Sequence, residues 1–421
     1  MADRLATVLG TVLDTGQLPV RLRGWDGSES GPPDAPVLHV RSRRALRRLV
    51  WSPGQLGLGR AYVAGEIDVP DDVFATFAAL SAVGKLSETG PMRGVALRDR
   101  LRLLRIAAAL GALGPEPAPP AEEARLDRVG RRHSRTRDAA AIAHHYDVGN
   151  DFYELVLGPS MVYSCAVWEG PGTGLDAAQE AKLDLVCRKL GLVEGSRLLD
   201  VGCGWGSLAI HAAGRYDADV IGVTLSEEQA RRARKRVAEA GLTDRVEIRV
   251  QDYRAVDDGP FDAISSIGMS EHVGRAELPG YLRHLAGLLR PGGRLLNHAI
   301  AWNAGRTHGD PDTFIARYVF PDGELISLGE TVSAVEAGGL EVVDVEALRR
   351  HYALTLRAWV RRLENSWDDA AALTSAGRAR VWRLYMAACA LAFERGSLGV
   401  DQVLAVAPGG EQPPMRRRAW V

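Results

Sequence analysis

The sequence lacks long apolar runs, paired cysteines and an excess of charge, and each absence excludes a class of protein. No stretch approaches the roughly 18 consecutive apolar residues of a membrane-spanning helix, and the first residues carry Asp3 and Asp14 where a signal peptide would be apolar. The 52 basic and 53 acidic residues leave a net charge of −1, whereas nucleic-acid-binding domains are strongly basic. We therefore expect a cytoplasmic protein that binds no nucleic acid.

Cysteine is also scarce. The four cysteines, Cys165, Cys187, Cys203 and Cys389, are widely spaced and form no C-x-x-C pair. This spacing predicts reduced thiols and no metal site.

At 421 residues the chain is long enough for more than one domain. Short alternating strands and helices in residues 1–110 predict a smaller α+β N-terminal domain. Residues 111–140 begin with proline, alanine and glutamate and continue into a basic segment, which predicts a linker. The catalytic domain is expected to occupy residues 141–421.

Strand and helix patterns alternate along this third part. The expected strands are Arg197–Asp200, Asp219–Val223, Val246–Val250, Ala263–Ile267 and Gly293–His298. The expected helices are Ser207–Tyr216, Ser226–Ala240 and Pro279–Leu289. This alternation predicts an α/β fold with a doubly wound parallel sheet, whose ligands bind at the carboxyl ends of the strands.

The first expected strand ends in Asp200 and breaks into a turn that contains Gly202, Gly204 and Gly206. Glycine lets the backbone approach a ligand closely, and the following helix directs its N-terminus at that ligand. The G-x-G-x-G spacing differs from the G-x-G-x-x-G of dinucleotide binders. It resembles the first motif of class I S-adenosylmethionine (SAM) methyltransferases, which implies a Rossmann-like sheet that binds SAM, with Asp200, Gly202, Gly204 and Gly206 as candidate contacts.

Two more strand ends carry cofactor candidates. Thr224 and Gln229 follow the second strand, where they could contact the ribose, although Ser226 and Gln229 also fit a helix capping box. Both interpretations can hold together. The residues after the third strand, Asp252, Tyr253 and Arg254, are candidates for the adenine edge.

Several further motifs occur in order: His144–Tyr153, Ser160–Ala166, Gly268–Gly274, Leu296–Ile300 and Tyr318–Gly323. Together they resemble the cyclopropane-fatty-acyl-phospholipid synthase family, which includes the mycolic acid cyclopropane synthases. The resemblance runs from about Ala141 to Ala405, and a fainter likeness relates Leu58–Val69 to the lipid-associated N-terminal domain of the family.

The resemblance implies roles for individual residues. The residues that would hold SAM are Tyr163, Ser164, Gly202, Gly204, Thr224, Gln229 and Tyr253. The residues that would surround a bicarbonate ion and form the catalytic set are Cys165, Glu271, His298 and Tyr352, assisted by the backbone of Ile300. Taken singly, each has an ordinary structural alternative: a helix cap for Glu271, and buried core side chains for the other three.

In this family the nucleophile is a carbon–carbon double bond, so the enzyme must position the olefin and exclude water. Methyl transfer leaves a carbocation, from which bicarbonate would remove a proton. A buried carboxylate beside an anion is costly, so we expect Glu271 to have a raised pKa or to share a proton with bicarbonate. Ser270, Asn297 and Ala301 depart from the common family pattern and resemble an actinobacterial branch. Some members of that branch make 10-methylene or 10-methyl chains, so a cyclopropane and a 10-methylene product both stay open.

A phospholipid substrate implies peripheral docking on the inner face of the membrane. In Leu97–Arg105, three leucines (97, 101 and 104) share one helical face and three arginines (98, 102 and 105) share another, as in a basic interfacial helix or in an ordinary packed amphipathic helix. Arg131–Arg137 and Arg416–Trp420 are further basic candidates. The resemblance also suggests a homodimer or larger assembly, and a separate reductase if the product is 10-methylene. The alternatives are a methyltransferase for a soluble unsaturated molecule and a lipid-binding protein with an inactive fold.

Overall fold

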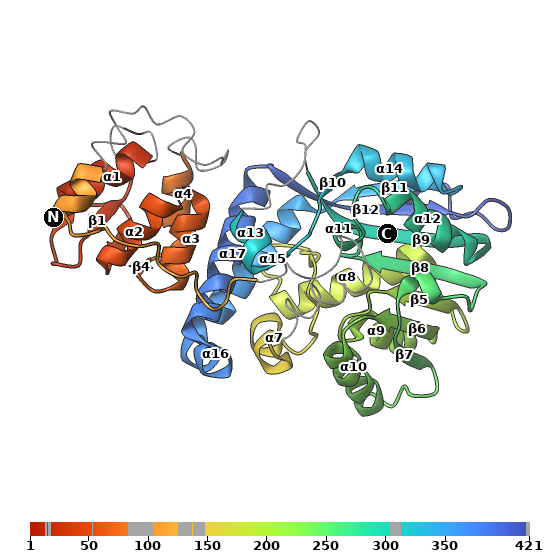
Figure 1. Cartoon of the computed structure of the whole chain (residues 1–421). Coiled ribbons are helices and arrows are strands. Elements are labelled where there is room, and N and C mark those ends of the chain that lie inside the picture. The colour runs from red at the N-terminus through yellow and green to blue at the C-terminus, as the bar shows by residue number, and fades with distance from the viewer. Residues whose placement is uncertain are drawn as a thin grey trace. The chain divides into compact units, whose positions relative to one another are not determined.

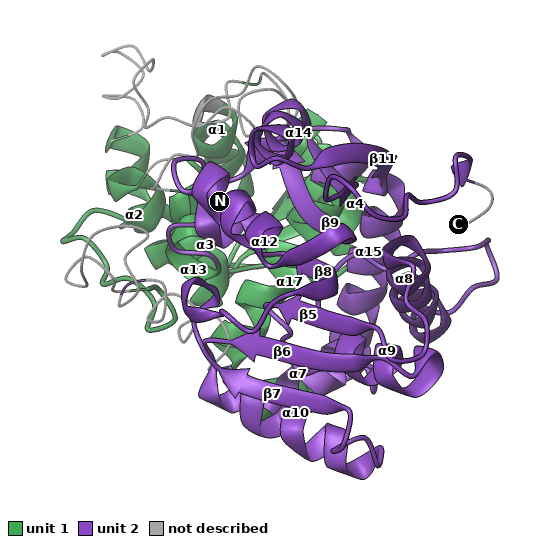
Figure 2. Cartoon of the chain, turned by 90° about the vertical axis from the view of Figure 1, so that its right-hand side faces the viewer, with its two compact units in different colours: residues 1–124, 310–319, 367–391 green, residues 125–309, 320–366, 392–421 purple. Residues whose placement is uncertain are grey.

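The computed structural model describes two compact units, each assembled from separate stretches of the chain (Figure 1). The described residues are 1–12, 15, 18–52, 54–82, 104–124, 137, 148–302 and 313–417. The first unit comprises residues 1–124, 310–319 and 367–391, and the second comprises residues 125–309, 320–366 and 392–421 (Figure 2).

The first unit contains a small mixed sheet with the strand order β2-β1-β3-β4. Its strands are β1 (Arg21–Arg23), β2 (Glu29–Ser30), β3 (Val37–Val40) and β4 (Ile67–Asp68). The accompanying helices are α1 (Ala2–Val12), α2 (Arg43–Trp51), α3 (Gln55–Val63), α4 (Val73–Ala82), α13 (Phe314–Tyr318), α16 (Trp367–Leu373) and most of α17 (Ala376–Glu394). The unit is α+β, as the sequence predicts.

Buried polar contacts hold the distant segments of this unit together. The guanidinium of Arg60 donates to both carboxylate oxygens of Glu123, at 2.8 and 2.6 Å, and Tyr318 donates to the same carboxylate at 3.1 Å. Arg383 donates to the Tyr62 hydroxyl at 3.0 Å. Residues 111–124, the first part of the expected linker, therefore pack within the first unit. The linear division into three parts stays a prediction.

The second unit is built on a sheet with the order β11-β12-β9-β8-β5-β6-β7 (Figure 1). The strands are β5 (Arg197–Val201), β6 (Asp219–Thr224), β7 (Val246–Val250), β8 (Phe261–Ile267), β9 (Leu289–Trp302), β11 (Glu341–Ala347) and β12 (Leu398–Val406), with β10 (Ile326–Ser327) beside β9. The strands from β9 to β7 along this order are parallel, whereas β12 and β11 are antiparallel additions. The doubly wound α/β sheet is thus confirmed.

Alternate residues of each strand enter two separate cores, as the period of two in a strand requires. Leu198 and Leu296 join the core beneath α8 (Leu175–Leu190), α9 (Ser207–Tyr216) and α10 (Glu227–Glu239). Leu199 and Leu295 join the core beneath α12 (Leu278–Gly287) and α14 (Leu328–Ala337). The strand order reverses beside β5, where a crevice for a ligand is expected at the carboxyl end.

Within the part of the chain that the structure describes, no helix is both long enough and apolar enough to cross a bilayer.

Candidate active site

The glycine turn lies at the carboxyl end of β5 and leads into α9. Gly202, Gly204 and Gly206 have φ values of 76°, 55° and 76°, a region that glycine adopts readily. A Cβ on Gly202 would lie 2.5 Å from the Met269 sulfur. Met269 directly precedes the short helix α11 (Ser270–Val273). The turn therefore lies against the segment that carries Glu271.

Asp200, the last polar residue before the turn, is directed into the protein. Its Oδ1 accepts a hydrogen bond from Ser265 Oγ at 2.7 Å, and burial raises its pKa to about 6. Lys182 of α8 is buried on the same side, and burial lowers its pKa to about 8. Asp200 therefore anchors the base of the turn, and its predicted contact with the cofactor stays a prediction.

The residues after β6 cap the next helix and also place a side chain beside the glycine turn. Ser226 Oγ accepts from Gln229 N at 3.2 Å, which is one half of the expected capping box. The Gln229 side chain instead accepts from Thr224 Oγ1 at 2.9 Å. Its Nε2 then lies 4.0 Å from the position that a Cβ on Gly204 would take. The amide donor of Gln229 therefore lies beside the glycine turn.

The end of β7 continues into a short 3₁₀ helix, η2 (Tyr253–Ala255). Asp252 caps this helix by accepting from Arg254 N at 2.9 Å. The Tyr253 ring packs edge-on against Tyr281 of α12, with 4.7 Å between centroids. The three predicted adenine-edge residues thus form one ordered corner at the carboxyl end of the sheet.

Glu271 and His298 each present one buried atom without a partner in the described structure. Glu271 Oε1 accepts from Ile300 N at 2.8 Å, while its Oε2 is shielded from solvent and unpaired. Burial raises the pKa of Glu271 to about 7, which confirms the expected direction. On the same strand as Ile300 and two residues before it, His298 Nδ1 lies 3.3 Å from Gln402 Nε2, and His298 Nε2 is unpaired.

The imidazole of His298 is neutral near pH 7. The side chain is 2% exposed, and its pKa falls to about 3 because of burial and the positive charges of Lys182 and Lys189. A neutral imidazole carries a single ring proton, so one nitrogen donates and the other accepts. The Ile300 N–H, which the resemblance assigns to bicarbonate, has Glu271 as its partner in this structure.

Tyr352 lies on α15 (Arg349–Asn365), and Cys165 contacts Leu348, the residue directly before that helix. Cys165 Sγ contacts the carbonyl oxygen of Leu348 at 3.6 Å, and burial raises the pKa of this thiol well above its ordinary value. Leu348 N donates to Val400 O at 2.8 Å, and Val400 pairs with Ile300 across the β9–β12 ladder. Cys165 and the start of α15 therefore lie beside β12 and β9, the strand that carries His298.

A series of aromatic rings links the glycine turn to Tyr352. Successive ring centroids lie 4.7 Å apart for Trp205 and Tyr153, 5.6 Å for Tyr153 and Tyr163, 5.5 Å for Tyr163 and Trp359, and 6.1 Å for Trp359 and Tyr352. The sequence alone predicts no role for Tyr153, Trp205 or Trp359. Only Trp205 lies inside a recognised motif, the glycine turn, and could have been linked to the site from its position in the sequence.

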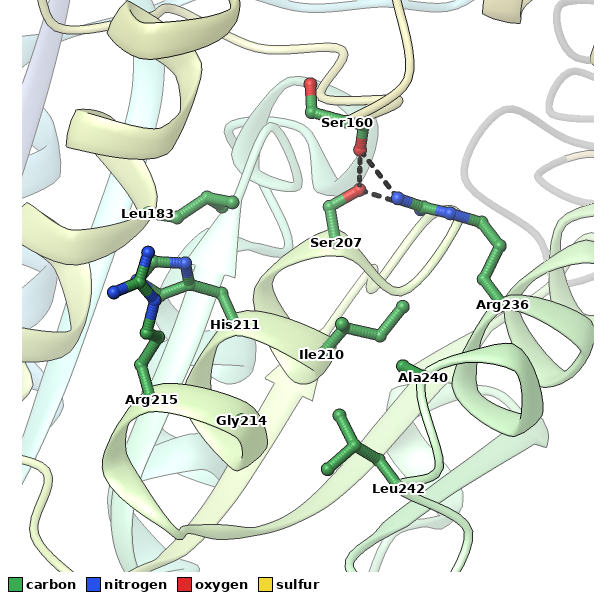
Figure 3. A pocket seen from close by; sticks show the side chains of 10 residues that line it. All are labelled: Ser160, Leu183, Ser207, Ile210, His211, Gly214, Arg215, Arg236, Ala240 and Leu242. Atoms are coloured by element: carbon green, nitrogen blue, oxygen red, sulfur yellow. Dashed lines mark hydrogen bonds between the residues drawn. The ribbon is translucent and has the colours of Figure 1, made fainter.

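A surface hollow of about 490 Å³ lies outside this region (Figure 3). Ser207, Ile210, His211, Gly214 and Arg215 line it from one face of α9. The opposite face of α9 packs into the core through Leu208, Ala209, Ala212 and Ala213. None of the predicted cofactor or catalytic residues lines this hollow, so we exclude it from the candidate site.

Comparison with known proteins gives matches over almost the whole chain. The sequence profile of the mycolic acid cyclopropane synthetase family matches residues 133–403. A probable fatty acid methyltransferase of Mycobacterium tuberculosis is 43% identical and aligns over 99% of this chain and 98% of its own length. The tuberculostearic acid methyltransferase of the same organism is 36% identical, with 91% and 87% covered. The cyclopropane-fatty-acyl-phospholipid synthase of Escherichia coli is 34% identical, with 84% of both chains covered.

Solved structures match over a shorter range. A mycolic acid cyclopropane synthase crystallised with S-adenosylhomocysteine and a CTAB detergent molecule superposes with a TM-score of 0.60 at 33% identity. The superposition covers 64% of this chain and 98% of that protein. The matched share is close to that of the sequence profile, 271 of 421 residues.

Proposed function

Because the chain belongs to the mycolic acid cyclopropane synthetase family and is a SAM-dependent C-methyltransferase, we propose that it methylates a cis double bond in an unsaturated fatty acyl chain of a phospholipid. The product is a cyclopropane or a 10-methylene branched chain. The two relatives named for tuberculostearic acid and for cyclopropane fatty acyl phospholipid support these two products about equally, at 36% and 34% identity.

The observation that carries the proposal is the pair of unpaired buried atoms, Glu271 Oε2 and His298 Nε2. Leaving such atoms without a partner costs about 1–3 kcal/mol each, so a polar ligand is expected beside them. The strand that carries His298 also supplies the Ile300 amide that fixes Glu271. These atoms do not serve to deprotonate the nucleophile, because an olefin has no proton to lose before it attacks.

The residues around the glycine turn fit SAM, which supplies an electrophilic methyl group when bound. Gly202, Gly204 and Gly206 all have positive φ and carry no side chain, so a ligand can approach the backbone of the turn closely, and Gln229 adds a side-chain donor beside Gly204. Thr224 orients that amide by donating to its oxygen. The ring of Tyr163 contacts Tyr153, whose ring packs against Trp205 of the turn.

The catalytic residues fit a small anion such as bicarbonate, which would accept a proton when bound. His298, a neutral Glu271 and the Cys165 thiol are uncharged donors or acceptors, and Lys182 adds a buried positive charge on the same side of the sheet. That charge lowers the pKa of His298 and therefore also favours an anion beside the imidazole. Glu271, with a pKa of about 7, can both hold and release a proton near neutral pH.

The aromatic series between Trp205 and Tyr352 suits the acyl chain. It presents apolar surface that excludes water from a reactive carbocation. The faces of aromatic rings also attract cations, by about 0.5–2 kcal/mol per ring. The series would therefore stabilise positive charge on the acyl chain without a charged nucleophile nearby.

Two of the three departures from the family pattern, Ser270 and Asn297, bond to each other next to Glu271. Ser270 Oγ donates to Asn297 Oδ1 at 2.9 Å, and Ser266 Oγ reaches the same oxygen at 3.3 Å. Both Ser270 and Asn297 are buried. Because the Ser270 hydroxyl and the Asn297 amide bond to each other, these two residues would influence which product forms only indirectly, by setting the position of Glu271.

Docking on the inner face of the membrane and assembly into a homodimer belong to the same proposal, as does a partner reductase for a 10-methylene product. Most of the basic segments expected to dock, residues 97–103, 131–136 and 418–420, lie outside the described residues. Of the arginines within the described part, Arg137 pairs with Asp322 and Arg417 pairs with Glu346. Those two charges are therefore engaged inside the second unit.

The test is incubation of the purified protein with SAM and vesicles of dioleoyl phospholipid, followed by mass spectrometry of the released fatty acids. Vesicles of dipalmitoyl phospholipid, which have no double bond, are the control. We expect a gain of one CH₂ in the oleoyl chains alone, and fragmentation then separates a cyclopropane from a 10-methylene chain. SAM binding without any gain would refute a phospholipid substrate and favour a soluble unsaturated molecule. Absence of SAM binding would favour an inactive fold.

A further inference from the structure

Gln402 is a fully buried amide beside the catalytic histidine. It lies on β12 directly opposite His298 in the antiparallel β9–β12 ladder, so both side chains emerge on the same face of the sheet. Gln402 is 0% exposed and His298 is 2% exposed. Gln402 Nε2 lies 3.3 Å from His298 Nδ1, and the Gln402 carbonyl oxygen has no partner in the described structure.

Only one assignment of donor and acceptor is chemically possible in this hydrogen bond. An amide nitrogen donates hydrogen bonds and does not accept them, so Nδ1 must be the acceptor and carries no proton. A neutral imidazole then holds its proton on Nε2. From this geometry we propose that Gln402 is a positioning residue that holds His298 as the Nε2–H tautomer, a hydrogen-bond donor toward the ligand of the site.

The inference deepens the proposed function and rests on it for the identity of the ligand. His298 Nε2 is buried and unpaired, so a donor at this atom can bind an anion, whereas a lone pair there would repel it. Turning the Gln402 amide would place its oxygen against Nδ1–H and create that lone pair. Gln402 therefore decides whether His298 binds an anion or acts as a base, and the observed orientation selects binding.

The surroundings keep the ring in this neutral form. Lys182 and Lys189 of α8 disfavour a second proton on His298, and burial acts in the same direction. Among the described residues no carboxylate is bonded to Nδ1, which distinguishes this histidine from one that is prepared to become imidazolium. The proton on Nε2 is thus fixed by one neutral amide.

The test uses the full-length chain labelled with ¹⁵N-histidine and a two-bond ¹⁵N–¹H correlation spectrum near neutral pH. The chain has ten histidines, and the signals of His298 are identified by their absence in His298→Asn. We expect the pattern of an Nε2–H tautomer. Gln402→Glu keeps the size but replaces the donor with an oxygen, and we expect it to shift His298 to a ring protonated on Nδ1. Gln402→Met, without either group, should give a mixture of tautomers.

Turnover provides the second readout. Gln402→Glu should lower kcat by about 100-fold, the size of effect seen when one preorganised donor is lost, with an unchanged Kd for SAM. A wild-type spectrum of the Nδ1–H form would overturn the inference without any variant, as would a Gln402→Glu protein that keeps both the Nε2–H pattern and full turnover. A wild-type protein with the Nε2–H pattern but no methyl transfer to acyl chains would refute the proposed function and leave the tautomer assignment standing.

Discussion

Replacement of Glu271 with glutamine tests the central chemistry of the site with little change in shape. The Glu271→Gln side chain can still accept from Ile300 N through Oε1, at the 2.8 Å observed for the carboxylate. The change is confined to Oε2, which becomes an amide that can donate but cannot take up or release a proton. We therefore expect intact SAM binding and a loss of turnover of about 100-fold or more, the usual contribution of general acid–base catalysis.

The raised pKa of Glu271 also predicts how the free energy of unfolding depends on pH, a dependence that Glu271→Gln removes. Burial raises the pKa of Glu271 from 4.5 to about 7. The folded protein therefore holds a proton that the unfolded chain releases between these two pH values. The resulting contribution to stability is present below pH 4.5 and is lost as pH rises through 7, by about 3 kcal/mol at 1.36 kcal/mol per pKa unit. Glu271→Gln should lack this decline with pH.

Infrared spectroscopy reads this proton directly. The difference spectrum between wild type and Glu271→Gln isolates the protonated carboxyl of Glu271, and we expect that band to disappear with a midpoint near pH 7. The exposed Glu277 gives the matched control, because Glu277→Gln should leave both turnover and the band unchanged. A midpoint near the ordinary pKa of 4.5 would refute the assignment of a raised pKa to Glu271. Turnover of Glu271→Gln within about threefold of wild type would refute its catalytic role.

Two further variants test the cofactor turn and the buried charges. Gly202→Ala places a Cβ 2.5 Å from the Met269 sulfur at a φ of 76°, and a strain of about 1–3 kcal/mol should weaken SAM binding by about tenfold or more in calorimetry. Gly280→Ala, whose Cβ meets nothing within 4 Å, is its control, and equal affinities would contradict the steric argument. Lys189→Met removes a fully buried ammonium from Asp344 at 3.1 Å and Glu346 at 2.7 Å, so unfolding in urea should become easier by about 3 kcal/mol. The neighbouring exposed pair gives the contrast: Arg188→Met should change stability by less than about 0.5 kcal/mol, and a similar loss in both variants would show that burial is not the cause.

The central strands were predictable because their residue pattern is local. The expected strand Val246–Val250 coincides with β7, and the expected helix Ser207–Tyr216 coincides with α9. An apolar strand, a glycine turn and an amphipathic helix each leave a signature within a few residues. The observed β9 is longer at both ends than the expected Gly293–His298, because pairing with β8 begins at Leu289 and pairing with β12 and β10 continues to Trp302.

The supporting contacts of the site were not predictable in the same way. The partner of His298 is Gln402, 104 positions away, and β12 joins the sheet antiparallel after several helices. The backbone of Ile300 is expected to assist anion binding, and the structure adds that its N–H bonds to Glu271. Such contacts depend on strand register between distant segments, which no local pattern specifies. The predicted roles of the individual site residues still await the experiments above.

The interleaved course of the chain has a consequence for its synthesis. The first unit needs α13 and residues 367–391 in addition to residues 1–124, and Tyr318 and Arg383 bond to its N-terminal part at 3.1 and 3.0 Å. The N-terminal segment therefore emerges from the ribosome long before its partners, and this unit cannot close until residues up to 391 have been made. Deleting residues 1–124 would likewise remove groups that α13 and α17 contact, since Tyr318 bonds to Glu123 and Arg383 bonds to Tyr62, so no single cut in the chain separates the two units.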